Sequence, residues 1–232
     1  MEPNIDIAKS LFAQKKYSEA ITACNEILSS HQHSIDALKL IAKSLLALKK
    51  IEEARLYLNK VLKIKPDDYE TIKNLGNSYR SEDDIKTAKT YYQKALSIHP
   101  SYSAALTNLG SIEIQHGNPQ EGITLLIKAT KSDPQFAQAW WNLANGYFKL
   151  GNIEEAKAAC KTTINLNPNL FQAHFLLASI FMGQQNFQEA EVPLRKTIEL
   201  NPGLFKAHFN LGVVLGAKGN FQDAEIYTRK AI

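Results

Sequence analysis

Long apolar runs are missing from this sequence of 232 residues. No stretch approaches the roughly 20 consecutive apolar residues of a transmembrane helix. The N-terminus carries Glu2 and Asp6 where a secretory leader would have basic residues followed by an apolar stretch. We therefore expect no contact with membranes, and we take the cytoplasm as the default compartment.

Neither sign of charge dominates. The chain has 27 lysines and arginines and 23 aspartates and glutamates, and its formal net charge is +4. A nucleic-acid-binding surface needs basic residues clustered on one face or along one helix, whereas these are dispersed. The charge balance therefore predicts no nucleic-acid partner.

Sequence motifs for metal binding, phosphate binding or catalysis are scarce as well. The sequence has no His-x₃-His or Cys-x₂-Cys spacing of the kind that binds zinc. Gly117 and Gly122 have the spacing of a phosphate-binding loop, but the Lys-Ser/Thr that must follow is absent. No paired carboxylates and no Ser-His-Asp arrangement stand out. We therefore expect no catalytic residue, no cofactor and no metal.

A strict period stands out instead. Prolines recur every 34 residues, at Pro66, Pro100, Pro134, Pro168 and Pro202. An internal period of this length predicts a stack of helical hairpins. With the proline near the end of each repeat, the repeats are residues 1–34, 35–68, 69–102, 103–136, 137–170, 171–204 and the incomplete 205–232. We expect one all-α solenoid over residues 1–232, built from about seven antiparallel helix pairs.

Four places in the repeat predict the packing. Large apolar residues at places 7 and 28 give each helix a buried stripe. Small residues at places 8 and 20 let two helices approach closely, so we expect the two helices of a pair to touch there. Place 7 holds Ile7, Ile41, Leu75, Leu109, Leu143, Leu177 and Leu211; place 8 holds Ala8, Ala42, Gly76, Gly110, Ala144, Ala178 and Gly212; place 20 holds Ala20, Ala54, Ala88, Gly122, Ala156, Ala190 and Ala224; place 28 holds Leu28, Leu62, Leu96, Thr130, Ile164, Ile198 and Ile232.

The turn between paired helices is marked by Gly-Asn in the middle of repeats 4, 5 and 7, which supplies a permissive backbone. Lys15 and Lys49 occupy the glycine place in the first two repeats. Pro193 lies inside the second helix of repeat 6, where it removes one backbone hydrogen bond; we expect a bend near Glu189.

Two pairs of residues could indicate a disulfide or a metal site, and the members of each pair share a repeat place. Cys24 and Cys160 both occupy place 24 of their repeats. They are four repeats apart, which corresponds to roughly 40 Å if each repeat lengthens the stack by about 10 Å. A disulfide needs Cα atoms within about 7 Å, so we expect reduced, small core residues. His174 and His208 occupy place 4 of their repeats, and Trp140 occupies the same place in repeat 5. This shared place favours packing over metal binding.

These columns resemble the tetratricopeptide repeat (TPR), whose pattern asks for Trp, Leu-Gly, an aromatic residue, Ala, an aromatic residue and a closing Pro. Repeat 5 matches it with Trp140, Leu143-Ala144, Tyr147, Gly151, Ala156 and Pro168; repeat 3 matches it with Leu75-Gly76, Tyr79, Ala88, Tyr92, Ala95 and Pro100. The resemblance implies a right-handed superhelical solenoid in which the first helix of each pair lines a concave groove. It extends to the repeat regions of O-linked N-acetylglucosamine transferases and to bacterial TPR scaffold proteins.

In such a fold, places 2, 5, 6, 9, 12 and 13 share the groove face of the first helix. In repeats 2 and 3 these places are polar, with Lys39, Lys43, Lys73, Asn74, Asn77 and Arg80. Later they become apolar, with Trp141, Phe148, Phe175, Met182 and Phe209. The rings could seat apolar side chains of a peptide, or pack against neighbouring helices; the lysines could bind a ligand or stay solvated.

Asparagine recurs at place 6, at Asn74, Asn108, Asn142 and Asn210. An amide can donate to and accept from a peptide backbone, and this row is similar to the asparagine ladder of O-linked N-acetylglucosamine transferases. Asp6, Leu40 and Leu176 interrupt it. The alternative is that these amides bond within the stack.

A second comparison is the carboxylate clamp of co-chaperone repeat domains. Lys73, Asn77 and Asn108 match three of its places, but Gln138 and Asn142 stand where it needs two cations. Charge-assisted bonds to a carboxylate are the strong ones, so a clamp built from this set would hold it weakly.

The sequence predicts a non-catalytic scaffold that binds an extended peptide or a helix of a protein partner in its concave groove. Two other hypotheses stay open. The repeats could be the targeting arm of a larger enzyme, such as a glycosyltransferase, whose catalytic domain is not in this chain. The chain could also associate with itself through its C-terminal hairpin.

Overall fold

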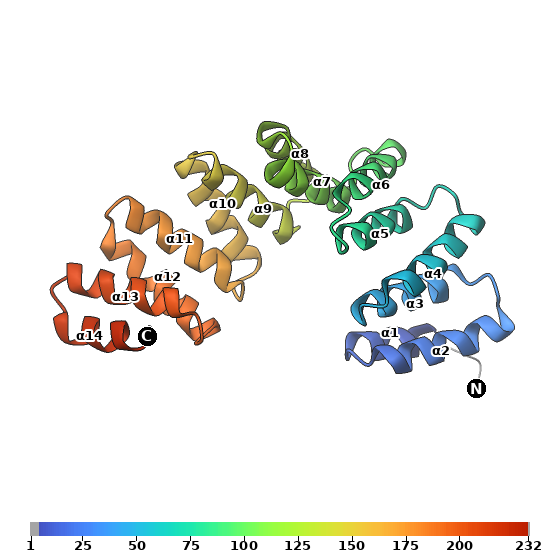
Figure 1. The fold of residues 1–232 in the computed structure, drawn as a ribbon, viewed down its shortest axis with the longest axis horizontal. Helices are drawn as coiled ribbons and strands as arrows, with labels where there is room; N and C mark the ends of the chain where they lie inside the picture. Colours follow the sequence, from blue (N-terminus) through green and yellow to red (C-terminus); the bar gives the residue numbers. More distant parts are fainter. Residues whose placement is uncertain (1–4, 232) are drawn as a thin grey trace. The chain divides into compact units, whose positions relative to one another are not determined.

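The structure is a computed structural model that describes residues 5–231. Over this range the chain forms fourteen helices and no strand, which confirms the all-α prediction (Figure 1). The helices are α1 (Ile5–Ala13), α2 (Tyr17–Ser30), α3 (Ile35–Ala47), α4 (Ile51–Ile64), α5 (Tyr69–Arg80), α6 (Ile85–Ile98), α7 (Ser103–His116), α8 (Pro119–Ser132), α9 (Ala137–Lys149), α10 (Ile153–Leu166), α11 (Phe171–Gly183), α12 (Phe187–Leu200), α13 (Phe205–Ala217) and α14 (Phe221–Arg229).

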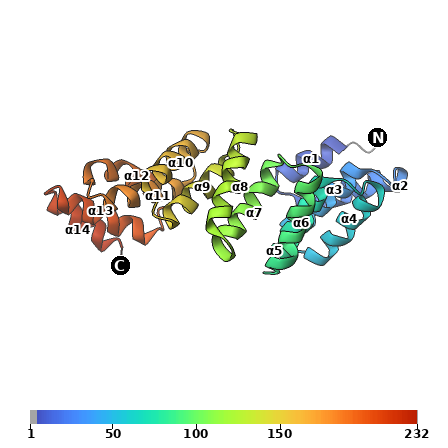
Figure 2. The ribbon, with the colours of Figure 1, turned by 90° about the horizontal axis from the view of Figure 1, so that it is seen from above.

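The chain divides into two compact bodies, and the boundary falls inside α7, between Leu109 and Gly110. We call them the N-terminal body and the C-terminal body. Within each body, consecutive helices pack against each other, α1 to α6 in the first and α8 to α14 in the second (Figure 2). Each predicted repeat therefore supplies one helix pair. A single solenoid over residues 1–232 stays a prediction.

The close contact between paired helices lies at places 8 and 20, as predicted. In repeat 4 both places are glycine, and a methyl group on Gly122 would lie 2.7 Å from the carbonyl oxygen of Gly110. In repeat 7, a methyl group on Gly212 would lie 3.1 Å from the carbonyl oxygen of Ala224. In these two repeats the backbones approach so closely that only small residues fit at places 8 and 20.

The large residues at place 7 are buried in six of the seven repeats. Ile7 is the exception, with 52% of its surface exposed, so the predicted buried stripe is wrong at this residue. The reason is that α1 packs against α2 and α3, which leave this side chain in solvent. Ile232, the last member of the place 28 column, lies outside the described residues.

The turn within each pair is left-handed at place 15. Gly151 and Gly219 have positive φ, and so do the residues that replace glycine, Lys15, Lys49, Asp83 and Gln185. Repeat 4 differs, since α7 runs on to His116. The side chain of Asn118 then accepts hydrogen bonds from the first backbone N–H groups of α8.

Pro193 lies inside α12, which is helical over its whole length, so the predicted helix is confirmed. The bend near Glu189 stays a prediction. Pro193 is buried, and its carbonyl oxygen accepts a hydrogen bond of 2.7 Å from the Thr197 hydroxyl.

The two histidines at place 4 are structural, as predicted. The Nε2 atoms of His174 and His208 donate to the carbonyl oxygens of Pro168 and Pro202, each at 2.9 Å. Trp140 Nε1 makes the same bond, also 2.9 Å, to a carbonyl oxygen of the preceding loop. Each bond joins one repeat to the proline that closes the repeat before it.

Both cysteines are free thiols in the core, which confirms that prediction. Burial raises the pKa of Cys24 to about 11 and that of Cys160 to about 12. A thiol needs to ionise before it can act as a nucleophile, so neither has the properties of a reactive cysteine. Within residues 5–231, no helix combines the length and the hydropathy that a membrane span requires.

Candidate functional site

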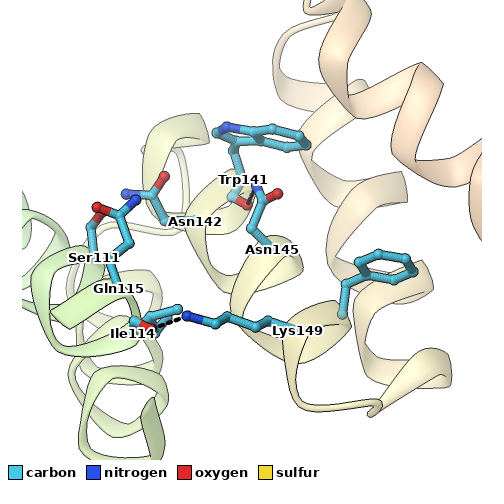
Figure 3. A pocket seen from close by; sticks show the side chains of 8 residues that line it. Ser111, Ile114, Gln115, Trp141, Asn142, Asn145 and Lys149 are labelled. Atoms are coloured by element: carbon cyan, nitrogen blue, oxygen red, sulfur yellow. Dashed lines mark hydrogen bonds between the residues drawn. The ribbon is translucent and has the colours of Figure 1, made fainter. Parts of the chain in front are cut away.

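A hollow of about 670 Å³ opens in the C-terminal body, between the last turns of α7 and the exposed face of α9. Figure 3 shows the side chains that line it. They come from the predicted groove places alone: places 9, 12 and 13 of repeat 4 and places 5, 6, 9, 12 and 13 of repeat 5. The lining residues are Ser111, Ile114, Gln115, Trp141, Asn142, Asn145, Phe148 and Lys149.

One long side chain crosses this hollow. Lys149 Nζ, at the end of α9, donates a hydrogen bond of 2.7 Å to the carbonyl oxygen of Ile114 in α7 (Figure 3). The bond satisfies a carbonyl near the C-terminus of α7, where the helix dipole also favours a cation. Lys149 thereby fixes one side of the hollow and presents its charge there.

The polar side chains of α9 are held in place by local bonds. Asn145 Nδ2 donates to the Trp141 carbonyl oxygen at 2.8 Å, which leaves the amide oxygen of Asn145 as an acceptor. Asn142 Oδ1 accepts from Gln138 Nε2 at 2.9 Å, which leaves the NH₂ group of Asn142 as a donor. The hollow therefore offers one fixed donor and one fixed acceptor at adjacent turns of one helix.

The predicted aromatic row separates into two kinds of residue. Trp141, Phe175 and Met182 are partly buried and pack against the core of the C-terminal body. Phe148 and Phe209 are exposed, at 40% and 51%. Of these five, the structure brings Trp141 and Phe148 together in the hollow, whereas the others lie on α11 and α13 outside it. Asn210, also on α13, does not line it either.

The polar face of the N-terminal body is occupied by ion pairs. Lys39 Nζ lies 2.8 Å from Asp68 and 3.1 Å from Glu70, and Lys43 Nζ lies 2.8 Å from the other oxygen of Glu70. Burial alone would raise the pKa of both carboxyls. The hydrogen bonds from the lysines, and from the Thr71 N–H to Asp68, outweigh it and leave both pKa values lowered. These two lysines are therefore already neutralised.

Lys73 is in a different state. Its Nζ donates to Asn74 Oδ1 at 2.7 Å, and burial lowers its pKa. The amide nitrogen of Asn74 is buried and, within residues 5–231, has no hydrogen-bond partner. Arg80 lies in the last turn of α5 and is partly exposed.

The asparagines of repeats 3 and 4 bond to each other. Asn77 Oδ1 accepts from Asn108 Nδ2 and from the Tyr92 hydroxyl, both at 2.8 Å. Burial raises the pKa of Tyr92 to about 12, so the phenol stays protonated and donates. Of the place 6 row, Asn108 therefore bonds within the stack, which is the alternative that the sequence left open. These bonds hold α5 and the first turns of α7 in register.

Five residues of the hollow were missed as individual candidates: Ser111, Ile114, Gln115, Asn145 and Lys149. The signal that could have found them is the repeat itself, since all five occupy groove places 9, 12 or 13. The described residues contain no group of three or more His, Cys, Asp or Glu side chains that could hold a metal ion.

Two family models match the chain, and both are described as tetratricopeptide repeat. One covers residues 11–76, 79–140 and 113–180, and the other covers residues 175–232. Neither describes a catalytic domain. A search among curated proteins found no match.

Several solved structures share the fold. MamA is 27% identical, over 68% of this chain and 92% of that chain, with a TM-score of 0.62. YrrB, described as a TPR protein with an unusual peptide-binding site, is 23% identical over 75% of this chain and 90% of that chain, with a TM-score of 0.65. The pilF protein of Pseudomonas aeruginosa is 18% identical over 85% of this chain and 90% of that chain, with a TM-score of 0.78.

Proposed function

The chain belongs to the tetratricopeptide repeat family, and from this premise we propose that it is a non-catalytic scaffold that binds an extended peptide of a protein partner in the hollow between α7 and α9. Stacks of such repeats generally serve as extended binding surfaces for proteins. The observation that carries the proposal is the hollow itself, because its lining comes from the groove places alone.

The chemistry of the lining fits a peptide. The exposed ring of Phe148 and the indole of Trp141 offer apolar contact area for one side chain of the ligand. The NH₂ of Asn142 and the amide oxygen of Asn145, which these bonds leave available, can bond a backbone carbonyl and a backbone N–H of the ligand. A volume of about 670 Å³ is within the usual range of ligand pockets.

The polar face of the N-terminal body is proposed as a second binding surface, which meets a polar or acidic stretch of the partner. Lys39 and Lys43 already pair with Asp68 and Glu70. Among the described residues Lys73 bonds an amide rather than a carboxylate, so its charge is the one we assign to the ligand.

Affinity capture from a native lysate tests the proposal. The substitutions Asn142→Ala and Phe148→Ala remove groups that are partly or largely exposed, so the variant should fold. We expect it to lose the proteins that the wild type captures. The matched control is Phe209→Ala, which removes an exposed ring from a groove place outside the hollow and should capture them all. Equal capture by the hollow variant and the wild type would contradict the proposal.

Self-association is a second candidate. Phe205, at 63% exposed, and Phe221, at 74% exposed, lie at the starts of α13 and α14, and α14 buries none of its side chains. Apolar surface of this kind commonly marks an interface. Light scattering of the wild type and of Phe205→Ser/Phe221→Ser distinguishes the outcomes: a dimer that becomes a monomer supports this candidate, and a monomeric wild type removes it.

The targeting-arm hypothesis concerns a longer protein. A reading frame that continues into a catalytic domain would support it, and the binding role proposed here would then deliver a substrate protein to that domain.

A further inference from the structure

Another hollow, of about 400 Å³, opens in the N-terminal body, on the side of the second helices α2 and α4. Leu28, Leu38 and Ile64 give it an apolar floor. Gln32 and His33, from the loop before α3, and Lys60 and Lys63 of α4 complete its lining. None of these residues occupies a groove place, so this site is separate from the peptide site proposed above.

The hollow coincides with a departure from the repeat. In repeats 5, 6 and 7 a ring at place 4 donates to the carbonyl oxygen of the preceding proline. Here the loop carries Gln32 in place of that proline, and place 4 is Leu38, whose side chain has no N–H to donate. The bond that ties the loops before α9, α11 and α13 to the following helix therefore cannot form here, and it cannot form in repeats 3 and 4 either, where place 4 is Ile72 and Leu106. The missing proline is what sets this loop apart.

The cations beside this hollow lack counterions. Among the described residues, Lys60 and Lys63 form no ion pair; Lys60 Nζ lies 4.6 Å from the centre of the Tyr57 ring. Other lysines next to the same helix are paired, Lys50 with Glu53 at 3.1 Å and Lys65 with Asp68 at 3.8 Å. No carboxylate is among the described residues that line the hollow. The hollow therefore combines an apolar floor with two positive charges that no carboxylate of its lining neutralises.

The corresponding hollow of the C-terminal body lacks this property. It lies between α8 and α10, is about 670 Å³ in volume and is apolar, but its lining includes one charge of each sign, Lys131 and Glu155. The two charges of its lining cancel. Complementarity of charge therefore distinguishes the N-terminal hollow.

We propose that the hollow between α2 and α4 docks an acidic peptide segment of a partner protein. One aliphatic or aromatic side chain of the segment would lie on Leu28, Leu38 and Ile64, and carboxylates flanking it would bond Lys60 and Lys63. A peptide fits better than a small anion for a geometric reason. Lys60 and Lys63 are one helical turn apart on α4 and line the same hollow as Leu28, Leu38 and Ile64, so a segment that carries carboxylates next to one apolar side chain matches both parts of the lining.

The first step of the test uses a display library of short random peptides, selected on the wild-type protein. We expect a class in which acidic residues flank one apolar residue. Fluorescence anisotropy of a labelled member of that class then measures its affinity for each variant. Lys60→Glu/Lys63→Glu should weaken binding by roughly tenfold or more, because two charge-assisted bonds become repulsions. Ile64→Ser keeps the charges, removes a floor residue that is 39% exposed, and should also weaken binding.

Matched controls separate this site from general electrostatics and from the peptide site. Lys86→Glu/Lys94→Glu makes the same change of net charge on α6, and Lys94 occupies the same repeat place as Lys60; it should bind as the wild type does. So should the Asn142→Ala/Phe148→Ala variant of the C-terminal hollow. The proposal is overturned if no acidic class is selected, if the peptide binds the Lys60→Glu/Lys63→Glu variant as tightly as the wild type, or if the α6 variant loses as much affinity. Full displacement of the peptide by decanoate would instead assign the hollow to a small amphiphile.

Discussion

The imidazole of His174 donates its Nε2–H to the carbonyl oxygen of Pro168, across 2.9 Å, and so ties repeat 6 to the proline that closes repeat 5. Because a carbonyl oxygen can only accept, the bond fixes which ring nitrogen carries the proton. The same place and the same acceptor recur in His208 with Pro202. In repeats 5, 6 and 7, one side chain thus connects the helix stack to the loop before it.

We expect His174→Phe to lower the free energy of unfolding by about 1 kcal/mol, since the phenyl ring keeps most of the packing and removes the hydrogen bond. Urea unfolding followed by circular dichroism measures it. His116→Phe is the control, because His116 is an exposed residue at the end of α7, and it should change stability little. Equal stability of the His174 variant and the wild type would show that the bond contributes nothing.

A second prediction concerns the left-handed turns. Lys49 has a φ of 61°, whereas Gly151 has 77° at the same repeat place. Left-handed backbone is strained for a residue with a Cβ and unstrained for glycine. Lys49→Gly should therefore stabilise the protein by up to about 1 kcal/mol, and Gly151→Ala should destabilise it by a similar amount, although nothing would touch the added methyl group. Opposite signs in thermal unfolding are the expected outcome, and a loss of stability in both variants would argue against strain at place 15.

A third prediction tests the closest helix contact. A methyl group on Gly122 would lie 2.6 Å from Ile114 Cγ1 and 2.7 Å from the Gly110 carbonyl oxygen, so backbone must shift to admit it. We expect Gly122→Ala to cost about 1–3 kcal/mol through overpacking. Gly183, in the last turn of α11, has open space around its Cα, and Gly183→Ala should be neutral or slightly stabilising. Chemical denaturation of both variants compares them; a Gly122→Ala protein as stable as the Gly183→Ala protein would disprove the close approach.

The fourth prediction follows from the ion pairs of the N-terminal body. The pKa values of Asp68 and Glu70 are lowered in the folded state. Their contribution to stability is therefore present above the ordinary carboxyl pKa, about 4, and is lost as the pH falls through the lowered folded values. The pKa of Lys39 is raised, since bonds to the two carboxylates outweigh burial. Its contribution is present below the ordinary lysine pKa, about 10.4, and is lost as the pH rises above it.

Unfolding curves at several pH values check this. The Asp68→Asn/Glu70→Gln variant should be less stable than the wild type near pH 7 and should lose less stability on acidification. Asp67→Asn, which changes an exposed neighbouring carboxyl, should follow the wild-type profile. If the double variant and the wild type lose stability in parallel below pH 4, the ion pairs are not the source of the acid sensitivity.

Much of the fold could be predicted because each signal acts locally. Gly110 and Gly122 predicted a helix contact from their residue type and repeat place, and the structure has that contact. Lys49 was identified as a residue in a glycine place, and its backbone is left-handed. Ile7 was predicted wrongly because burial depends on which helices cover a side chain, and a column of like residues does not record that.

The sequence predicted which face of the first helices forms the binding site, but it did not predict which residues of that face line the hollow. The groove places include all eight residues of the C-terminal hollow, yet only Trp141, Asn142 and Phe148 were singled out. Ser111 and Asn145 have common side chains, and nothing in their identity distinguishes them from a solvated helix face. Their role depends on how α7 and α9 are spaced in three dimensions.

By itself, the sequence determined the period, the helix pairs, their turns and the small-residue contacts, because each repeat is a local unit that packs on its neighbours. Only the tertiary structure decided which polar groups remain available. Lys39 bonds Asp68 and Glu70, which lie 29 and 31 residues away, and Asn77 bonds Asn108, 31 residues away. Asp68 closes the repeat that contains Lys39, whereas Glu70 and Asn108 lie in the repeats that follow those of Lys39 and Asn77. Distance and burial decide which of several donors and acceptors a side chain bonds, and the residues of one repeat do not specify them.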